Sequence, residues 1–550
     1  MSSHRRKNQI NKKDYDRVLI TETLPYETPI IFSNEGLYER IVKIETAPKI
    51  LQTLLRCLVF GEGEAKTHSS IPYLYKIRKD SREFRRLALI HPRSQWKMRE
   101  FYQKYQDLIV YHCSHSPASI RSPKKVAGSF YFKGVMENLK QYKDESISHF
   151  SLEELIKHSP TYFSYRGYDR LYKFFESKDY FELEKRHQVM LTLDVSKCFD
   201  SIYTHTMSWA IKDKEFTKAH VSVSATFAQE FDELMQHANH RETNGIVIGP
   251  EISRIFAEII FQEVDTVTIR KLKKEKLEFG EHYAFRRYVD DVFIFCGSEG
   301  DAQKVYNCYS DVLLTFNLHA NVSKSKTLRR PFVTTKSRLI QAASLEINRF
   351  VEKFLELVDG GEVLKPKRIR SGWRLTRSVV ASIKSLCSSN QSNYDEVAPY
   401  LIAVLSELIK KIASIQAVED SEDRQLEYRD ALLVLLDVLY FLYEVSPSVG
   451  SSYKLCTAVI LTIRFSRKHI PLIESTLAQR VYELTAGLLA GRSLGGGFNA
   501  IDGFLPLEVL NVVLTLRELG EDYLMPEPLL KELFLRAPIH SYFGIISYLF

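Results

Sequence analysis

The chain lacks the features that mark secreted, membrane-spanning or zinc-stabilised proteins. Its seven cysteines are scattered without the paired spacing of a metal site, and several lie in apolar segments, so we expect buried free thiols in a reducing compartment. No apolar run is long enough to cross a membrane. The N-terminal stretch is polar and basic without an apolar core, which argues against secretion. These absences predict a cytoplasmic protein without a membrane partner.

The composition is that of an ordinary soluble protein. At 550 residues the chain has room for several domains and a large core. Hydrophobic residues make up 45% and charged residues 26% of the sequence. The net charge of +8 permits a polyanionic partner but does not establish one, since a basic surface is also common in proteins without such a partner.

Two stretches concentrate carboxylates where strands are expected. Between Phe285 and Phe295, β-branched and aromatic residues flank Asp290-Asp291, which predicts a β-hairpin with the acidic pair at its bend. Adjacent ionised carboxylates repel each other, so a divalent cation is a better explanation than a solvated turn. Asp194 ends a second apolar strand, 189–193. Together these carboxylates predict two metal ions about 4 Å apart for in-line phosphoryl transfer, with magnesium favoured and manganese as the alternative.

At these residues the sequence resembles the palm of reverse transcriptases. Asp194 matches the first catalytic aspartate, and Tyr288 to Asp291 match the tyrosine-x-aspartate-aspartate box. Asn244 to Ile259 match the palm motif between them, and the resemblance extends over roughly residues 115–335. It implies an α+β fold with right-hand-like fingers and palm, and a magnesium-dependent nucleotidyltransferase that uses dNTPs. The implied metal ligands are Asp194, Val195, Asp290 and Asp291.

The resemblance also implies residues that bind the nucleotide, and these are Arg121, Phe199, Gly249 and Tyr288. Arg121, just before a proline, would meet the triphosphate because a guanidinium binds phosphate bidentately; a plain Ser-Pro turn is the alternative. Phe199 stands five residues after Asp194, where an aromatic ring excludes a 2′-hydroxyl; a core aromatic is the alternative. Gly249 allows the backbone to approach the nucleotide closely.

A palm lysine is expected to protonate the leaving pyrophosphate. Lys326, in Lys324-Ser325-Lys326-Thr327, matches the family's Lys-Thr pair and is assigned as catalytic. Lys324 competes for the role because the Asn-x-x-Lys spacing of the family fits Asn321 to Lys324. A solvated lysine is the alternative for both.

A narrower resemblance points to the abortive-infection (Abi) group of bacterial reverse transcriptases. It is carried by Tyr203-Thr204-His205, Trp209, Ser253-Arg254-Ile255 and a helical C-terminal region. It implies template-independent DNA synthesis that starts from a protein hydroxyl, a single-stranded DNA product attached to the protein, a homo-oligomer (trimer or hexamer) and antiphage defence. We expect His205 to bond locally and shape the palm, with a catalytic role as the alternative.

A protein primer would be a tyrosine in an irregular segment, because a phenol ionises more easily than an aliphatic hydroxyl and a primer must move with the growing strand. The N-terminal candidates are Tyr15, Tyr26 and Tyr38. Tyr542 and Tyr548 are C-terminal alternatives.

The expected domain organisation has three parts. Residues 1–345 form the reverse transcriptase-like domain, with a helical N-terminal and fingers part over 1–185, in which 81–112 is expected to be helical, and a palm over 186–345. Residues 346–378 are a basic linker. Residues 379–550 contain successive amphipathic stripes with short breaks and predict an all-α HEAT-like domain, although no clean repeat period is visible.

Two other functions remain open on the sequence. An RNA-templated reverse transcriptase of the retron or group II intron type shares the palm motifs, but no endonuclease or maturase-like extension is visible. An inactive palm that binds nucleic acid is the second alternative, and the intact Asp194, Asp290 and Asp291 argue against it.

Overall fold

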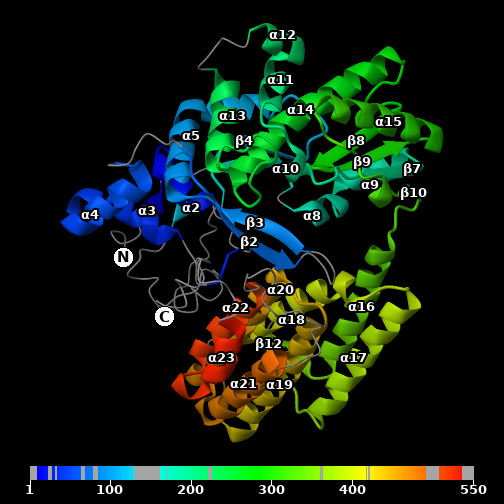
Figure 1. Cartoon of the computed structure of the whole chain (residues 1–550). Coiled ribbons are helices and arrows are strands. Elements are labelled where there is room, and N and C mark those ends of the chain that lie inside the picture. The colour runs from blue at the N-terminus through cyan, green and yellow to red at the C-terminus, as the bar shows by residue number, and fades with distance from the viewer. Residues whose placement is uncertain are drawn as a thin grey trace.

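The computed structural model of the chain has a mixed upper part and a helical lower part (Figure 1). It describes residues 9–10, 12–22, 28–30, 34–62, 69–78, 84–127, 130–131, 161–168, 170–220, 226–358, 363–415, 418, 421–490 and 507–534. The upper part runs from the N-terminal helices to a four-stranded sheet, and the lower part contains the C-terminal helices. The fold class is therefore α+β, as the sequence predicted.

The N-terminal part surrounds one long helix. Its helices are α2 (Val18–Thr21), α3 (Glu35–Val42), α4 (Lys49–Leu55) and α5 (Pro92–His112). A hairpin of β2 (Tyr73–Arg78) and β3 (Phe84–Leu89) interrupts them, so the prediction of one helix over 81–112 was wrong for its first part. Leu87 pairs with Tyr75 in this hairpin, and both are buried, so tertiary packing overrides the helical spacing.

Short elements connect this part to the sheet. They are β1 (Gln9–Ile10), β4 (Arg121–Val126), β5 (Phe130–Tyr131), β6 (Phe163–Gly167), α8 (Leu171–Phe175) and α9 (Lys178–Arg186). β4 pairs with β6, and β1 pairs with β5, both antiparallel.

The four-stranded sheet carries both carboxylate motifs. Its strands are β7 (Val189–Leu193), β8 (Tyr283–Tyr288), β9 (Asp291–Cys296) and β10 (Thr327–Arg329). They are antiparallel in the order β10-β7-β9-β8, so β7 lies directly beside β9. Leu193 pairs with Val292, which brings the residue after β7 to the end of the sheet where the β8–β9 turn lies.

Helices cover both faces of this sheet. The helices that follow β7 in the chain are α10 (Cys198–Ser201), α11 (Thr206–Lys212), α12 (Lys214–Ala219), α13 (Phe227–Ala238), α14 (Glu251–Lys274) and α15 (Glu299–Thr315). Leu191, Phe285 and Ile294 share one buried core with α14 and α15. On the other face, Phe293 and Phe295 pack against α8 and α9. The sheet is thereby held rigidly from both sides.

The C-terminal part has one continuous apolar core. Its elements are α16 (Thr335–Glu352), β11 (Leu355–Val358), β12 (Val363–Pro366), α17 (Gly372–Ser389), α18 (Ala398–Ala413), α19 (Glu422–Val445), α20 (Val449–His469), α21 (Glu474–Ala490), α22 (Leu507–Thr515) and α23 (Glu527–Phe534). The segment expected to be a linker, 346–378, thus contains the end of α16, a β-hairpin and the beginning of α17. The domain boundaries and the HEAT-like repeat remain predictions.

The β2–β3 hairpin joins the two parts (Figure 1). On one side, Tyr75, Ile77 and Leu87 form a small buried cluster with side chains of α20 and α22. Glu508 of α22 accepts a hydrogen bond from the Arg78 backbone N–H at 3.1 Å. The C-terminal helices therefore support the hairpin directly.

Two expectations about composition can be compared with this fold. All seven cysteines are free thiols, and five of them are buried. Within the described ranges, no helix combines the length and the hydropathy that a bilayer crossing requires.

Candidate active site

The acidic pair lies at a two-residue turn, as the sequence predicted. Tyr288 and Asp291 pair across the ends of β8 and β9, and Val289 and Asp290 form the turn between them. Val289 has φ of 58°. A positive φ is rare for a β-branched residue and costs roughly 1–3 kcal/mol. The surrounding structure must therefore hold this turn in place.

A buried arginine supplies that support. Arg287 is fully buried, and its Nη1 donates to the Val289 carbonyl at 3.0 Å. The same guanidinium pairs with Glu258 at 2.7 Å and with Asp265 at 2.9 Å, both on α14. Since a charge buried without a partner is costly, the three charges fix one another and attach the turn to α14.

Neutral donors complete this network beneath the turn. Glu258 accepts from the hydroxyl of Ser119 at 2.7 Å, and Asp265 accepts from Ser116 at 2.7 Å and from Tyr309 at 2.8 Å. Every charged member therefore has further hydrogen bonds, which is the condition for a buried polar network to make the structure rigid. The network therefore holds the β8–β9 turn in place.

Asp194 follows β7 and faces the turn from the neighbouring strand. Its Oδ2 accepts from Asn321 Nδ2 at 3.2 Å and lies 3.0 Å from Lys324 Nζ. The hydrogen bond that Lys324 donates to Asp194 raises the pKa of Lys324, and the charges of Asp291 and Asp290 raise it further. Lys326 is exposed, and its backbone pairs with Thr192. Of the two lysines left open by the sequence, the structure brings Lys324 to the carboxylates.

The three aspartates lie close enough to repel one another. Burial raises the pKa of Asp291 to about 7, and the charges of Asp290 and Asp194 contribute. Burial also raises the pKa of Asp290, with a further contribution from Asp194. Carboxylates whose ionisation is opposed in this way are typical of sites that bind a cation.

The donor set fits a hard divalent cation by its chemistry. The converging side chains are three carboxylates, and the aliphatic Val195 can contribute only its backbone carbonyl, so all available ligands are oxygens, as magnesium prefers. Among the residues that the structure describes, no group of three or more His, Cys, Asp or Glu side chains stands in metal-binding geometry. The Lys324 ammonium instead balances the charge of Asp194.

Arg121 lies near the turn but is already engaged. Its Nη2 pairs with Glu251 at 3.1 Å, and its guanidinium stacks 4.3 Å from the centre of the Tyr165 ring. The Tyr165 hydroxyl also donates to Glu251. The role of Arg121 in binding a triphosphate stays a prediction. It requires that a phosphate replace Glu251 as the partner of the Arg121 guanidinium.

A second cation approaches from the β2–β3 hairpin. Arg85 is exposed on β3, and its charge lowers the pKa of Asp290, although burial raises that pKa more. Sequence reasoning missed Arg85 because residues 81–112 were expected to form a helix. The signal that could have found Arg85 is the pattern of cations among apolar residues in two neighbouring segments. Lys76 and Arg78 lie in the first segment, and Arg85 and Arg86 lie in the second.

Two of the residues expected to contact the nucleotide, Phe199 and Gly249, lie in α10 and in the loop before α14. The Phe199 carbonyl accepts from the Ile246 N–H at 2.8 Å, so α10 is tied to the loop before α14. Gly249 has φ of 138°, and a Cβ there would lie 2.9 Å from the Ala88 carbonyl oxygen. Only glycine fits this close approach of the loop to β3. Phe199 is partly buried against the palm core, which leaves its sugar-excluding role a prediction.

His205 bonds locally, in agreement with the first of its two interpretations. Its Nδ1 lies 2.5 Å from Asp232 Oδ2 on α13, and the Tyr203 ring contacts it edge-on at 4.8 Å. Asp232 also accepts from Gln236 at 2.6 Å. The three-residue motif thus joins the start of α11 to α13.

The candidate priming tyrosines differ in accessibility. Tyr38 is buried in α3, and its hydroxyl donates to Asp14, so burial and this bond raise its pKa above the ordinary value. Tyr15 is partly exposed next to α5. Tyr26, Tyr542 and Tyr548 lie outside the described residues.

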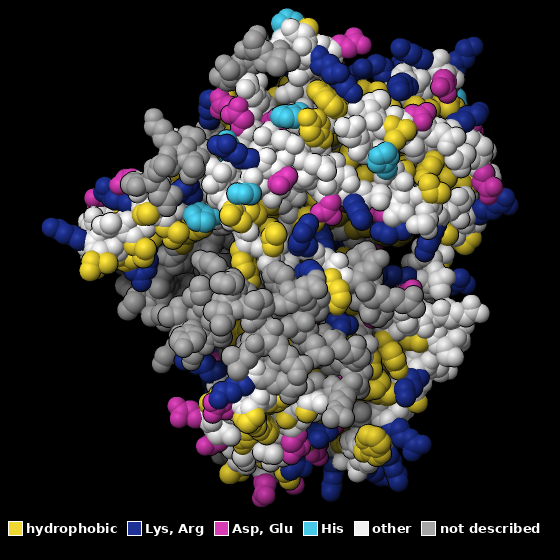
Figure 2. Space-filling model, viewed as in Figure 1, with side chains coloured by type: hydrophobic (Ala, Val, Ile, Leu, Met, Phe, Trp, Pro, Cys, Tyr) yellow, Lys and Arg dark blue, Asp and Glu magenta, His cyan; other side chains and the backbone are white. Residues whose placement is uncertain are grey.

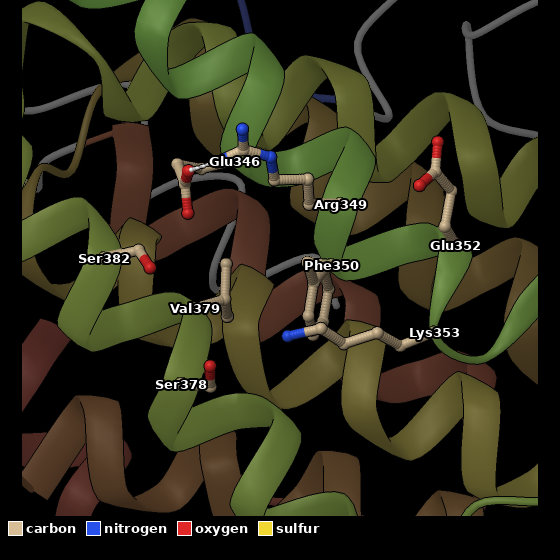
Figure 3. Close-up of a pocket in the computed structure, with 8 residues that line it drawn as sticks. All are labelled: Glu346, Arg349, Phe350, Glu352, Lys353, Ser378, Val379 and Ser382. Carbon is tan, nitrogen blue, oxygen red and sulfur yellow. Dashed lines mark hydrogen bonds and ion pairs between the residues drawn. The ribbon is translucent and has the colours of Figure 1, made fainter.

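A pocket of about 390 Å³ lies between α16 and α17, away from these residues. Figure 3 shows the residues that line it: Arg349 and Phe350 of α16, Lys353 just after α16, and Ser378 and Ser382 of α17. None of the predicted site residues lines this pocket, so we do not assign the chemistry to it.

Comparison with known proteins agrees with the geometry at the level of the domain. Residues 135–350 match the family model for reverse transcriptase (RNA-dependent DNA polymerase). The matched range contains all three aspartates, so this part of the chain matches a reverse transcriptase domain. No curated protein matches the sequence. The narrower Abi assignment is not tested by these matches and remains a prediction.

Solved telomerase structures are similar only at a distance. Telomerase from Candida albicans in complex with a TWJ fragment of telomeric RNA has a TM-score of 0.29 at 10% identity, covering 82% of this chain and 68% of that chain. Apo telomerase from Candida tropicalis has a TM-score of 0.30 at 12% identity, covering 82% of this chain and 69% of that chain. At these values the likeness carries no argument about function.

Proposed function

We propose that this chain is a magnesium-dependent DNA polymerase that adds deoxynucleotides to a hydroxyl. The observation that supports the proposal most strongly is the meeting of Asp194 with Asp290 and Asp291 at one end of the sheet. A binding module has no reason to gather three mutually repelling, partly buried carboxylates, whereas a phosphoryl-transfer site needs them to hold cations.

The residues of the chain have separable tasks in this reaction. The metal would be held by Asp194, Asp290, Asp291 and the Val195 carbonyl. Lys326 would no longer be the first choice for the residue that protonates the leaving pyrophosphate. Bound magnesium would lower the pKa of the attacking hydroxyl and neutralise charge on the leaving pyrophosphate.

Lys324 carries a proton on Nζ beside Asp194, and its raised pKa keeps that proton in place until a phosphate oxygen can accept it. Arg85, across from Asp290, would attract the negative triphosphate. Phe199 would press against the sugar and exclude a 2′-hydroxyl, and Gly249 would let the loop approach the nucleotide.

A finer proposal follows from the Abi resemblance. Synthesis would need no template, would start from a tyrosine of the chain, and would leave single-stranded DNA attached to the protein. The protein would act as a homo-oligomer in cytoplasmic antiphage defence. Among the candidates within the described residues, Tyr15 suits priming better than Tyr38, because the phenol of Tyr38 is buried and bonded to Asp14.

The test is incubation of the purified full chain with magnesium and labelled dNTPs, with and without an RNA template. Asp290→Asn is the inactive variant, and Asp311→Asn, an exposed position on α15, is the matched control. Template-free product attached to the protein supports the finer proposal. Product only with template would instead assign an RNA-templated reverse transcriptase. No product under either condition would leave an inactive palm that binds nucleic acid.

A further inference from the structure

One segment of the chain carries cations and no carboxylate. Residues 363–394 contain no Asp or Glu. The cationic residues of this segment are Lys365, Lys367, Arg368, Arg370, Arg374, Arg377 and Lys384. The segment is therefore strongly cationic by composition, and the structure shows where it lies. Figure 2 shows Lys and Arg side chains along the lower right edge, where Figure 1 places α17.

Packing of α17 fixes which of its sides meets solvent. Thr376, Val379, Ile383 and Cys387 are buried, and they share one face of the helix. A Cβ on Gly372 would lie 3.0 Å from Val434 of α19, so the first turn is pressed against the C-terminal core. The opposite side of the helix is therefore held outward and cannot rotate into the core.

Trp373 lies on the outward side and is 71% exposed. The other two tryptophans, Trp96 and Trp209, are partly buried and each has a cation over its ring. A tryptophan buries a large apolar area when it packs in a core, so an exposed indole on a well-packed helix leaves a ring face available for a ligand.

The cations of α17 lie on the same side as the indole. With about 100° of rotation per residue, Trp373, Arg377 and Lys384 fall on one stripe, and Arg374 lies next to it. Among the described residues, Arg374, Arg377 and Lys384 form no ion pair within 4.0 Å. We call Trp373, Arg374, Arg377 and Lys384 the α17 stripe. Its charges are not neutralised by neighbours, unlike those of an ordinary mixed surface.

Acidic groups are present nearby but face elsewhere. Lys367 Nζ lies 3.9 Å from Glu356, and Arg349 pairs with Glu346 at 2.7 Å in the pocket between α16 and α17 (Figure 3). That pocket also contains Glu352, so its two cations and two carboxylates balance. The uncompensated charge is on the α17 stripe.

We propose that the α17 stripe binds single-stranded nucleic acid, with a base stacked on Trp373 and phosphates paired with Arg374, Arg377 and Lys384. Non-specific single-strand sites combine exposed aromatic rings with a track of cations in this way, and a single strand offers the unstacked bases that an indole needs. The inference rests on the proposed function in that the strand would be the one the enzyme makes or copies.

The size of the stripe limits what it can hold. Eleven residues of helix separate Trp373 from Lys384, which is about 16 Å along the axis and accommodates only a few nucleotides. Three phosphate contacts on a single strand give a salt dependence of about −2 for log K against log salt.

The test measures binding of a fluorescein-labelled oligo(dT) to the full chain by anisotropy, in EDTA and without dNTPs. Trp373→Ala is expected to weaken binding roughly 5- to 150-fold, as loss of one stacked base does, and Trp373→Phe is expected to retain most of it. Arg374→Gln combined with Arg377→Gln is expected to reduce the salt slope by about 1.4, since each phosphate contact contributes about 0.7.

The matched control is Lys271→Gln with Lys274→Gln, two exposed cations at the end of α14 in the palm. Retained affinity and salt slope in this control, with losses in the α17 variants, support the proposal. Equal affinity of parent and Trp373→Ala, or equal losses in the control, would overturn it. Circular dichroism confirms that each variant is folded.

Polymerase activity does not enter this measurement. The assay contains neither magnesium nor dNTPs, so a failed polymerase assay with retained α17-dependent binding refutes the proposed reaction alone. A working polymerase whose binding is insensitive to Trp373→Ala refutes the α17 site alone.

Discussion

Replacement of Asp291 by Asn is expected to stabilise the metal-free protein, increasingly so as pH rises. Burial, with Asp290 and Asp194, raises the pKa of Asp291 from 3.8 to about 7. The folded-state pKa is therefore above the unfolded-state value. Such a carboxyl contributes its full stability below the unfolded pKa, and that contribution is lost as pH rises through the folded pKa. The window runs from about pH 4 to about pH 7.

The magnitude follows from the size of the shift. A difference of about three pKa units, at 1.36 kcal/mol each, corresponds to a loss on the order of 4 kcal/mol across the whole window. Between pH 5 and pH 8 the loss is on the order of 2–3 kcal/mol. Because Asn does not titrate, Asp291→Asn avoids this loss and gains that amount of stability relative to the parent.

The assay is thermal unfolding of the full chain in EDTA at several pH values between 5 and 8, with Asp311→Asn as the control. The stability difference between Asp291→Asn and the parent should widen with pH, and magnesium should stabilise the parent more at pH 8 than at pH 5. A difference that stays constant with pH, together with no response to magnesium, would refute the account of three converging carboxylates.

The remaining predictions test separate parts of the site. Asp194→Asn should abolish labelled dNTP incorporation with unchanged circular dichroism, and normal incorporation would contradict its assignment as a metal ligand. Phe199→Ala should raise ATP incorporation relative to dATP, unless the parent already uses both equally. Arg287→Ala should lower the free energy of unfolding by about 3–5 kcal/mol, because it leaves two buried carboxylates unpaired. Arg286→Ala removes a partly exposed ion pair and should lower the free energy of unfolding much less in the same denaturation experiment. Tyr15→Phe should eliminate protein-linked DNA while dNTP binding persists, and linked product in this variant would exclude Tyr15 as the primer.

The parts of the site that could be predicted from the sequence have local causes. The hairpin around Asp290 follows from its β-branched and aromatic flanks, and the strand before Asp194 follows from a short apolar run. Helix α14 begins at Glu251, directly after Pro250. In these cases local preference and tertiary packing agree.

The parts that could not be predicted depend on contacts between distant segments. Glu251 engages Arg121 across 130 positions, and nothing local to either residue indicates the pair. The choice between Lys324 and Lys326 depends on how the loop after α15 meets Asp194, since both lysines are exposed and similar in sequence. The β3 strand was missed because Leu87 is buried through pairing with β2 and packing against the C-terminal helices, and neither contact can be inferred from the local spacing of apolar residues.

The buried acids of α14 show a signal that the sequence contained but that was not used. Glu258 and Asp265 lie seven positions apart, on the same face of a helix rich in Ile and Phe. Two acids on an apolar face need a buried cation, and Arg287 is the arginine nearest to the catalytic turn. This pattern would have predicted the support of the turn.

The central claim, that Asp194, Asp290 and Asp291 form one nucleotidyltransfer site, is tested most directly by incorporation of labelled dATP in the presence of magnesium. The account predicts incorporation by the parent, its loss on chelation by EDTA, and its absence in Asp290→Asn at every magnesium concentration. Robust incorporation by Asp290→Asn at the parental rate would contradict it.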